Sequence, residues 1–169
     1  MTNNDLLRRI RFILDLNDNA MIKIFGLADH TVSRAEISSL LKHHADKDFN
    51  ACNDKLLAYF LNGLIVFKRG ERDGPKPAVE SKLNNNMVFT KLKIAFNLKS
   101  DDIMELIELA NFKMSKHELS AFFRKPSHQH YRKCKDQILR QFVKGLQIKL
   151  RGPITDDAFD DQEDLESLD

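Results

Sequence analysis

The chain repeats itself, and this internal repeat constrains the fold more than any single motif. Shifting the sequence by 82 residues places Arg8–Gly70 over Thr90–Gly152 without a gap. Fourteen of the 63 aligned pairs are identical, whereas chance gives about four. Most apolar positions that differ keep their apolar character. We therefore predict two structural copies, assigned to residues 1–70 and 87–152, joined by a linker over 71–86 and followed by an acidic tail over 153–169.

Each copy has the spacing of amphipathic helices, with apolar residues at steps of three and four. Asp18 and Ser100 are placed to cap a second helix, and the last helices are expected over 54–68 and 136–150. No alternating strand pattern occurs. We predict an all-α protein of two tandem four-helix repeats related by a pseudo-twofold, with about four helices in each copy.

The stretch VSRAEISSLL and its copy MSKHELSAFF both carry a capping box, Ser33-x-x-Glu36 and Ser115-x-x-Glu118. The second and third helices together also resemble a helix-turn-helix, whose third helix would read DNA. Two observations weaken this reading: the usual glycine of the turn is missing, and base-reading side chains are scarce. What the two copies share is the cap and the apolar stripe, so we interpret the third helix first as a capped core element.

Gly63 and Gly145 occupy equivalent positions inside the last helices, where glycine costs about 1 kcal/mol relative to alanine. We expect a close helix crossing to offset that cost, and we place it where one repeat meets the other. A merely tolerated glycine is the alternative.

Charge is unevenly distributed along the chain. Residues 156–169 hold eight of the 25 acidic residues and none of the 27 basic ones, so the rest of the chain has a net charge of +10. The second copy is the more basic, with 14 Lys and Arg against six acids over 90–152. Such a surface attracts polyanions, and the acidic tail either competes for it or only solubilises the protein. The candidate nucleic-acid contacts are Lys116, Arg124, Lys125, Arg132, Lys133, Lys135, Arg140 and Lys144, with Arg34 and Lys42 in the first copy.

Residues with catalytic or metal-binding chemistry are few. Cys52 and Cys134 match between the copies, but no histidine does, so no general base accompanies them, and we interpret both as buried structural cysteines with Asp54 and Asp136 capping the next helix. His128, His130 and Cys134 have the spacing of three metal ligands but lack a fourth. We expect neither enzymatic activity nor a cofactor. No secretory signal or membrane-spanning run is found, and a cytoplasmic protein is expected.

Taken as a whole, the sequence resembles the YehS-like family of bacterial proteins of unknown function, which carry the same domain in tandem. The resemblance implies two helical units and a soluble bacterial protein, but it supplies no catalytic or binding residues. We expect a non-enzymatic binding protein for which nucleic acid is the leading partner, and the alternative is a protein-interaction adaptor that uses a groove between the repeats. The stretches that carry the resemblance are LRRIRFILDLNDNAMIKI (7–24), CNDKLLAYFLNGLI (52–65), NNNMVFTKLKIAFNLKSDDI (84–103) and CKDQILRQFVKGL (134–146).

Overall fold

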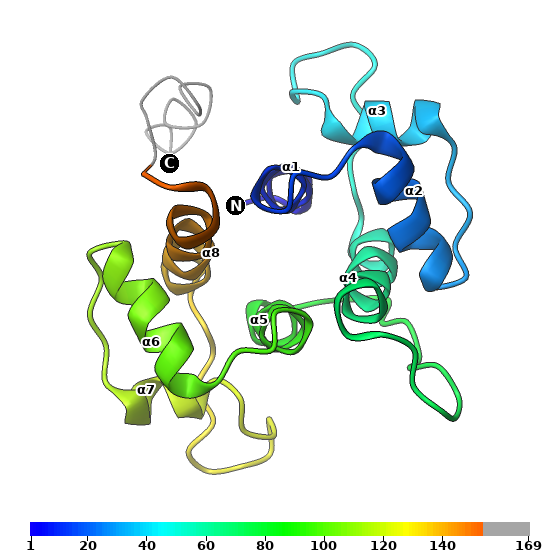
Figure 1. Cartoon of the computed structure of the whole chain (residues 1–169). Coiled ribbons are helices and arrows are strands. Elements are labelled where there is room, and N and C mark those ends of the chain that lie inside the picture. Colours follow the sequence, from blue (N-terminus) through cyan, green and yellow to red (C-terminus); the bar gives the residue numbers. More distant parts are fainter. Residues whose placement is uncertain (154–169) are drawn as a thin grey trace.

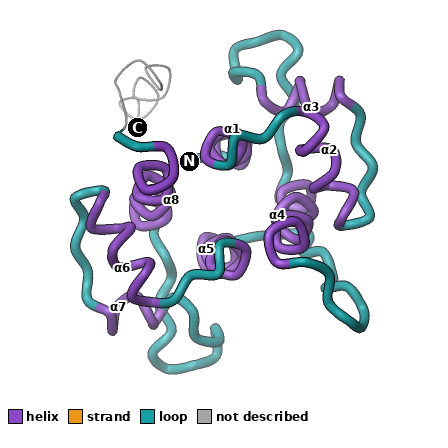
Figure 2. The backbone as a smooth tube through the Cα atoms, viewed as in Figure 1, coloured by secondary structure: helices purple, strands orange, loops and turns teal. Residues whose placement is uncertain are grey.

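The computed structural model describes residues 1–153, and these fold into eight helices without a strand, as predicted (Figures 1 and 2). The predicted acidic tail lies outside the described residues from 154 onward. The fifth helix begins at Asn85, inside the segment that we assigned to the linker. The helices of the first copy are α1 (Asn3–Ile13), α2 (Asp18–Leu27), α3 (Arg34–Leu41) and α4 (Asp54–Arg69), and those of the second are α5 (Asn85–Ala95), α6 (Ser100–Leu109), α7 (Lys116–Ala121) and α8 (Asp136–Arg151).

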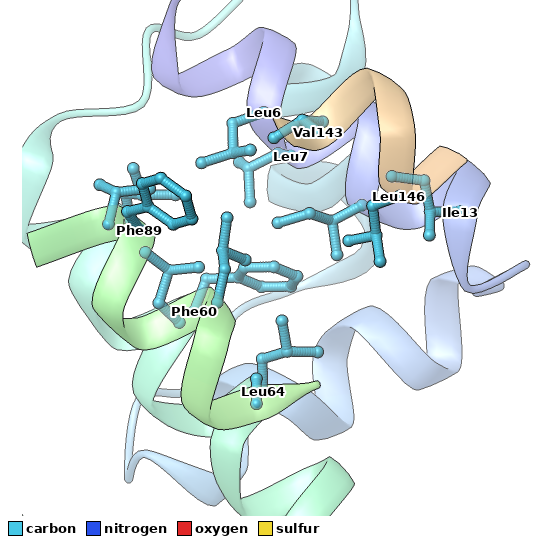
Figure 3. Close-up of a cluster of buried hydrophobic side chains, with 14 of the residues drawn as sticks. Leu6, Leu7, Ile13, Phe60, Leu64, Phe89, Val143 and Leu146 are labelled. Atoms are coloured by element: carbon cyan, nitrogen blue, oxygen red, sulfur yellow. The ribbon is translucent and has the colours of Figure 1, made fainter. Parts of the chain in front are cut away.

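The centre of the molecule is built from α1, α4, α5 and α8, which Figure 1 views along their axes. Helix α4 packs on α5, and its counterpart α8 packs on α1, as a pseudo-twofold between the copies requires. Leucine and phenylalanine side chains of both copies fill the space between these helices (Figure 3). Phe60 of α4 and Phe89 of α5 are fully buried there. The two repeats therefore share one continuous hydrophobic core.

The four central helices run in the same direction. At their N-terminal ends, the side-chain amide of Asn3 donates a hydrogen bond to the carboxylate of Asp54, and that of Asn85 donates to the carboxylate of Asp136. At their C-terminal ends, Arg151 of α8 lies over the Phe12 ring of α1. Lys68 of α4 likewise lies over Phe96, which ends α5. One end of the molecule thus collects four helix N-termini and the other collects four C-termini.

Helices α2 and α6 each lie against the last helix of their own copy at a glycine. A Cβ added at Gly63 would stand 1.8 Å from the carbonyl oxygen of Ile24, and one at Gly145 would stand 1.8 Å from that of Leu106. The predicted close crossing is therefore present in both copies. Its predicted place was wrong, because the partners are α2 with α4 and α6 with α8, within each repeat, and not one repeat with the other.

The helix caps refine three predictions. Ser33 and Ser115 cap α3 and α7 as expected, each accepting from the amide three residues on. Asp18 and Ser100 do not cap α2 and α6, because both stand at the first helical position, after Asn17 and Lys99. Asn17 caps α2 through its side-chain oxygen, which accepts from the amide of Ala20 at 2.8 Å. Asp54 and Asp136 are also one residue inside their helices, after Asn53 and Lys135.

Within residues 1–153, no helix is both long enough and apolar enough to cross a lipid bilayer.

Candidate nucleic-acid interface

The segment between α7 and α8, residues 122–135, is the most basic loop of the described structure, and we call it the basic loop. It contains five Lys or Arg residues and no acid, whereas its counterpart in the first copy, residues 40–53, contains two of each. Of the five basic side chains in residues 122–135, all but that of Arg124 are exposed. The loop therefore gives the second copy a positive surface that the first copy lacks. Its basic residues are Arg124, Lys125, Arg132, Lys133 and Lys135.

A buried asparagine fixes both ends of this loop to α5. The Nδ2 of Asn86 donates to the carbonyl oxygens of Phe122 at 3.1 Å and Arg132 at 2.8 Å. Its Oδ1 accepts from the amide of Cys134 at 2.9 Å. Arg132 also donates its amide to the carbonyl of Ala121, at the end of α7. The basic side chains thus project from a loop whose backbone is held in place.

The first copy has the same device. Asn4 donates to the carbonyls of Leu40 and Asn50 and accepts from the amide of Cys52. Neither asparagine was predicted from the sequence, because the repeat was aligned only from Arg8 onward. The signal was present, since the pair Asn3-Asn4 recurs as Asn85-Asn86 at the same offset of 82 residues.

The basic loop enters α8 at the helix N-terminus, where the helix dipole adds positive potential. In the first copy, the side chain of Asn53 caps the equivalent helix by accepting from Leu56 at 2.8 Å. In the second copy, Lys135 occupies the cap position and supplies no side-chain acceptor. The cap position of α8 is consequently positive, whereas that of α4 is neutral.

The ten candidate contacts do not form a single surface. Arg140 and Lys144 follow the basic loop along α8, at steps of one helical turn from Asp136. Lys116 lies at the start of α7 and pairs with Asp101 of α6 at 3.0 Å. Arg34 and Lys42 lie at the two ends of α3, on the far side of the central helices from α7 (Figure 1). The seven candidates from 124 to 144 thus follow one another along the basic loop and α8, and the other three lie apart from them.

Three ring side chains accompany the positive charges in the basic loop. His128 and His130 are exposed, with ring centroids 5.5 Å apart, and Tyr131 is half-buried. The amide of His130 donates to the Nδ1 of His128, which stabilises the turn between them. Exposed rings among basic residues are the combination that stacks on unpaired bases while contacting phosphates.

The two cysteines are buried and free. Burial raises the pKa of each thiol to about 12. Such a thiol is almost wholly protonated near neutral pH and is a poor nucleophile. His128, His130 and Cys134, whose spacing suggested metal ligands, do not form a metal site. Among residues 1–153, no three His, Cys, Asp or Glu side chains are grouped so as to hold a metal ion.

The second and third helices differ from a DNA-reading helix-turn-helix in the length of their connection and in the length of the third helix. The connection from α2 to α3 covers residues 28–33, which is longer than the three or four residues typical of that motif. Helix α7 has only six residues and is about 9 Å long. The helix-turn-helix likeness therefore stays a prediction.

Two surface grooves lie at the other end of the central helices. The α1–α3 groove, of about 780 Å³, is formed by the C-terminal half of α1, the following turn and α3. The α6–α8 groove, of about 660 Å³, is formed by α6, α8 and the turn after α5, with Lys68 of α4 at its rim. This second groove is shared by the two repeats, because α4 belongs to the first copy and the other elements to the second.

Comparison with known proteins agrees with this duplicated architecture. The family model described as "Protein of unknown function (DUF1456)" matches the chain twice, over residues 3–70 and 85–152. The chain is 41% identical to "Uncharacterized protein YehS" of Escherichia coli (strain K12) over 148 residues, which cover 86% of this chain and 94% of that protein. No solved structure matches the chain significantly. The resemblance predicted from the sequence is thereby confirmed.

Proposed function

Because the chain belongs to the family of unknown function whose domain it carries in tandem, we propose its function from its geometry: it binds nucleic acid non-specifically through the basic loop and the adjoining face of α8. The observation that carries this proposal is the basic loop, which holds five Lys and Arg residues, contains no acid and leads into α8. The corresponding loop of the first copy has no net charge at all.

The contacts would be mainly with phosphates. Exposed Lys and Arg side chains neutralise phosphates without reading sequence, and each contact releases condensed counterions. Tyr131 and the two histidines add ring surfaces for unpaired bases. We therefore propose a preference for single-stranded or loop-containing nucleic acid over regular duplex.

We also propose that this binding is the protein's activity and that no catalysis accompanies it. The two equivalent cysteines are buried with raised pKa values, so they support no nucleophilic step at neutral pH. Two unpaired buried thiols also suit a reducing compartment, which supports placing the protein in the cytoplasm.

A salt titration tests the proposal. Fluorescence anisotropy would follow a labelled single-stranded RNA and a labelled DNA duplex with the full chain and with a chain ending at Pro153. We expect binding that weakens steeply as salt rises, with a log–log slope of about −0.7 per phosphate contact on single strands. Failure of both protein forms to bind either probe at about 50 mM salt would contradict the proposal.

The second candidate, a protein-interaction adaptor, is favoured by the α6–α8 groove. Its apolar lining includes Leu109 and Leu150, which are 43% and 48% exposed. Three carboxylates, Asp102, Glu105 and Glu108, flank this apolar strip. The groove therefore suits a partner helix with an apolar stripe edged by basic residues.

A peptide titration examines this second candidate. The probe would be a synthetic amphipathic helix of leucine and lysine, added to the full chain and to the variant Leu109→Ser, Leu150→Ser. Both leucines are exposed, so the variant should fold normally, and a loss of affinity of about tenfold or more is expected if the groove is the site. Equal affinity for both proteins would exclude this groove.

A further inference from the structure

The C-terminal ends of the four central helices form a surface that is both basic and apolar. Four of the five exposed large apolar side chains of the described structure lie there: Phe12, Phe67, Ile94 and Leu150, each 36–48% exposed. Positive side chains at helix C-termini offset the negative end of the helix dipole. The same surface carries Arg11, Lys68, Arg69, Lys149 and Arg151.

The rest of the chain leaves from this surface. Helix α8 ends at Arg151, Gly152 turns the backbone with a φ of +87°, and the described structure ends at Pro153. The segment that follows contains eight acidic residues from Asp156 to Asp169, interrupted by Phe159, Leu165 and Leu168. An acidic segment with spaced apolar residues is complementary to a basic surface with exposed apolar side chains.

Charge selects one of the two grooves at this end. In the α1–α3 groove, Arg8 pairs with Asp5 and Arg11 pairs with Asp18. Its further positive charges are Lys42 in the lining and Arg151, which lies over Phe12, 4.8 Å from the ring centroid. The α6–α8 groove has three carboxylates against two lysines. An acidic segment is attracted to the first groove and repelled by the second.

We propose that residues 156–169 bind in the α1–α3 groove of the same chain. Their carboxylates would contact the basic lining, and their apolar side chains would cover Phe12 and Leu41. This proposal concerns a surface distinct from the basic loop, so it stands independently of the proposed nucleic-acid function.

Because the segment is covalently attached to α8 near the groove, it needs to span only a short distance and is present at high effective concentration. Asp156 is five residues beyond Arg151, a span of up to about 17 Å, while Arg8 is one turn, about 6 Å, from Phe12 along α1. Tethering also gives the segment an effective concentration in the millimolar range. The basic loop, in contrast, lies at the opposite end of the 16-residue α8, about 24 Å away.

Amide NMR spectra of the full chain and of a chain ending at Pro153 test the proposal. Both contain all eight helices and the whole described core. We expect the amides of residues 11–18, 41 and 42 to shift between the two proteins, while those of residues 122–135 stay unchanged. Spectra that differ only next to the truncation would overturn the proposal, as would shifts confined to the basic loop or to the α6–α8 groove. Shifts that disappear on dilution would assign the contact to a second copy of the chain.

A peptide spanning residues 154–169, added to the chain ending at Pro153, provides an independent test. Reversing two charges of the groove, Lys42→Glu and Arg151→Glu, should weaken peptide binding roughly tenfold at low salt. The matched control reverses two charges of the other groove, Lys68→Glu and Lys149→Glu, and should change affinity much less. Equal losses in the two variants would show that only net charge matters and would remove the assignment to the α1–α3 groove.

Discussion

Gly63 of α4 faces the carbonyl oxygen of Ile24 in α2 so closely that a Cβ on the glycine would lie 1.8 Å from that oxygen. Gly145 has the same relationship to Leu106 in the second copy. The obstacle is backbone and cannot rotate away as a side chain would. These two glycines therefore set the separation of the helices that form the body of each repeat.

The variant Gly63→Ala should destabilise the protein strongly. Alanine is the better helix former, but here its methyl group forces α2 away from α4, and we expect the free energy of unfolding to fall by about 2 kcal/mol or more. Gly26→Ala is the matched control, because a Cβ there meets no atom within 4 Å. That variant should gain about 0.5–1 kcal/mol. Urea denaturation measures both, and equal effects would contradict the close-crossing account.

The Asn86 clamp should matter for both stability and binding. In Asn86→Ala, the amide of Cys134 and the carbonyls of Phe122 and Arg132 lose their partner, at a cost of about 2 kcal/mol or more in unfolding free energy. Asn4→Ala removes the equivalent bonds in the first copy and should cost a similar amount. Only Asn86→Ala should also weaken nucleic-acid binding, because only the second loop is basic. Equal weakening of nucleic-acid binding by both variants would show that the basic loop is not the binding surface.

Stability should depend on pH through Asp54. Hydrogen bonds from the amide of Leu83 and the side chain of Asn3 lower the pKa of this carboxyl below its usual value of 3.8. A lowered folded-state pKa contributes stability that is present above pH 4 and is lost as pH falls through the folded-state value. Asp54→Asn should therefore be less stable than the natural chain at pH 7, with the difference shrinking below pH 4. A difference that stays constant with pH would show that the charge does not matter.

Both thiols should resist modification in the native protein. Their pKa values of about 12 and their burial leave little accessible thiolate at pH 8. A thiol-specific disulfide reagent should therefore react slowly with the folded chain and rapidly with the chain in urea. Rapid reaction without unfolding would contradict the structural role of Cys52 and Cys134.

The sequence predicted the helical class, the duplication and both capping serines, because these features are local or repeat at a fixed offset. The last helices were predicted over 54–68 and 136–150 and end one residue later, at Arg69 and Arg151. The cap of α2 was misplaced by one residue, because Asn17 and Asp18 are adjacent residues of similar capping ability. That of α6 was misplaced because its cap position is Lys99, a residue type that does not signal a cap. Local chemistry therefore located the last helices, and the starts of the second and third helices, within about one residue.

Long-range relationships were less accessible from the sequence. The contact of Gly63 with Ile24 follows from the packing of α2 on α4, which periodicity alone does not reveal. The candidate residues Arg34 and Lys42 lie on the far side of the central helices from α7 (Figure 1), which the sequence alone does not reveal. The Asn86 clamp joins α5 to residues more than 30 positions away, and only an alignment started at Asn3 would have drawn attention to it.

The central functional claim is that the basic loop binds nucleic acid, and neutralising four of its charges tests this most directly. One variant carries Lys125→Gln, Arg132→Gln, Lys133→Gln and Lys135→Gln. The control carries the same loss of charge at exposed lysines elsewhere, as Lys23→Gln, Lys47→Gln, Lys68→Gln and Lys149→Gln. For single-stranded RNA, the salt dependence of the loop variant should be shallower by about 0.7 for each lost contact, with little change in the control. Equal slopes for the loop variant and the natural chain would contradict the account.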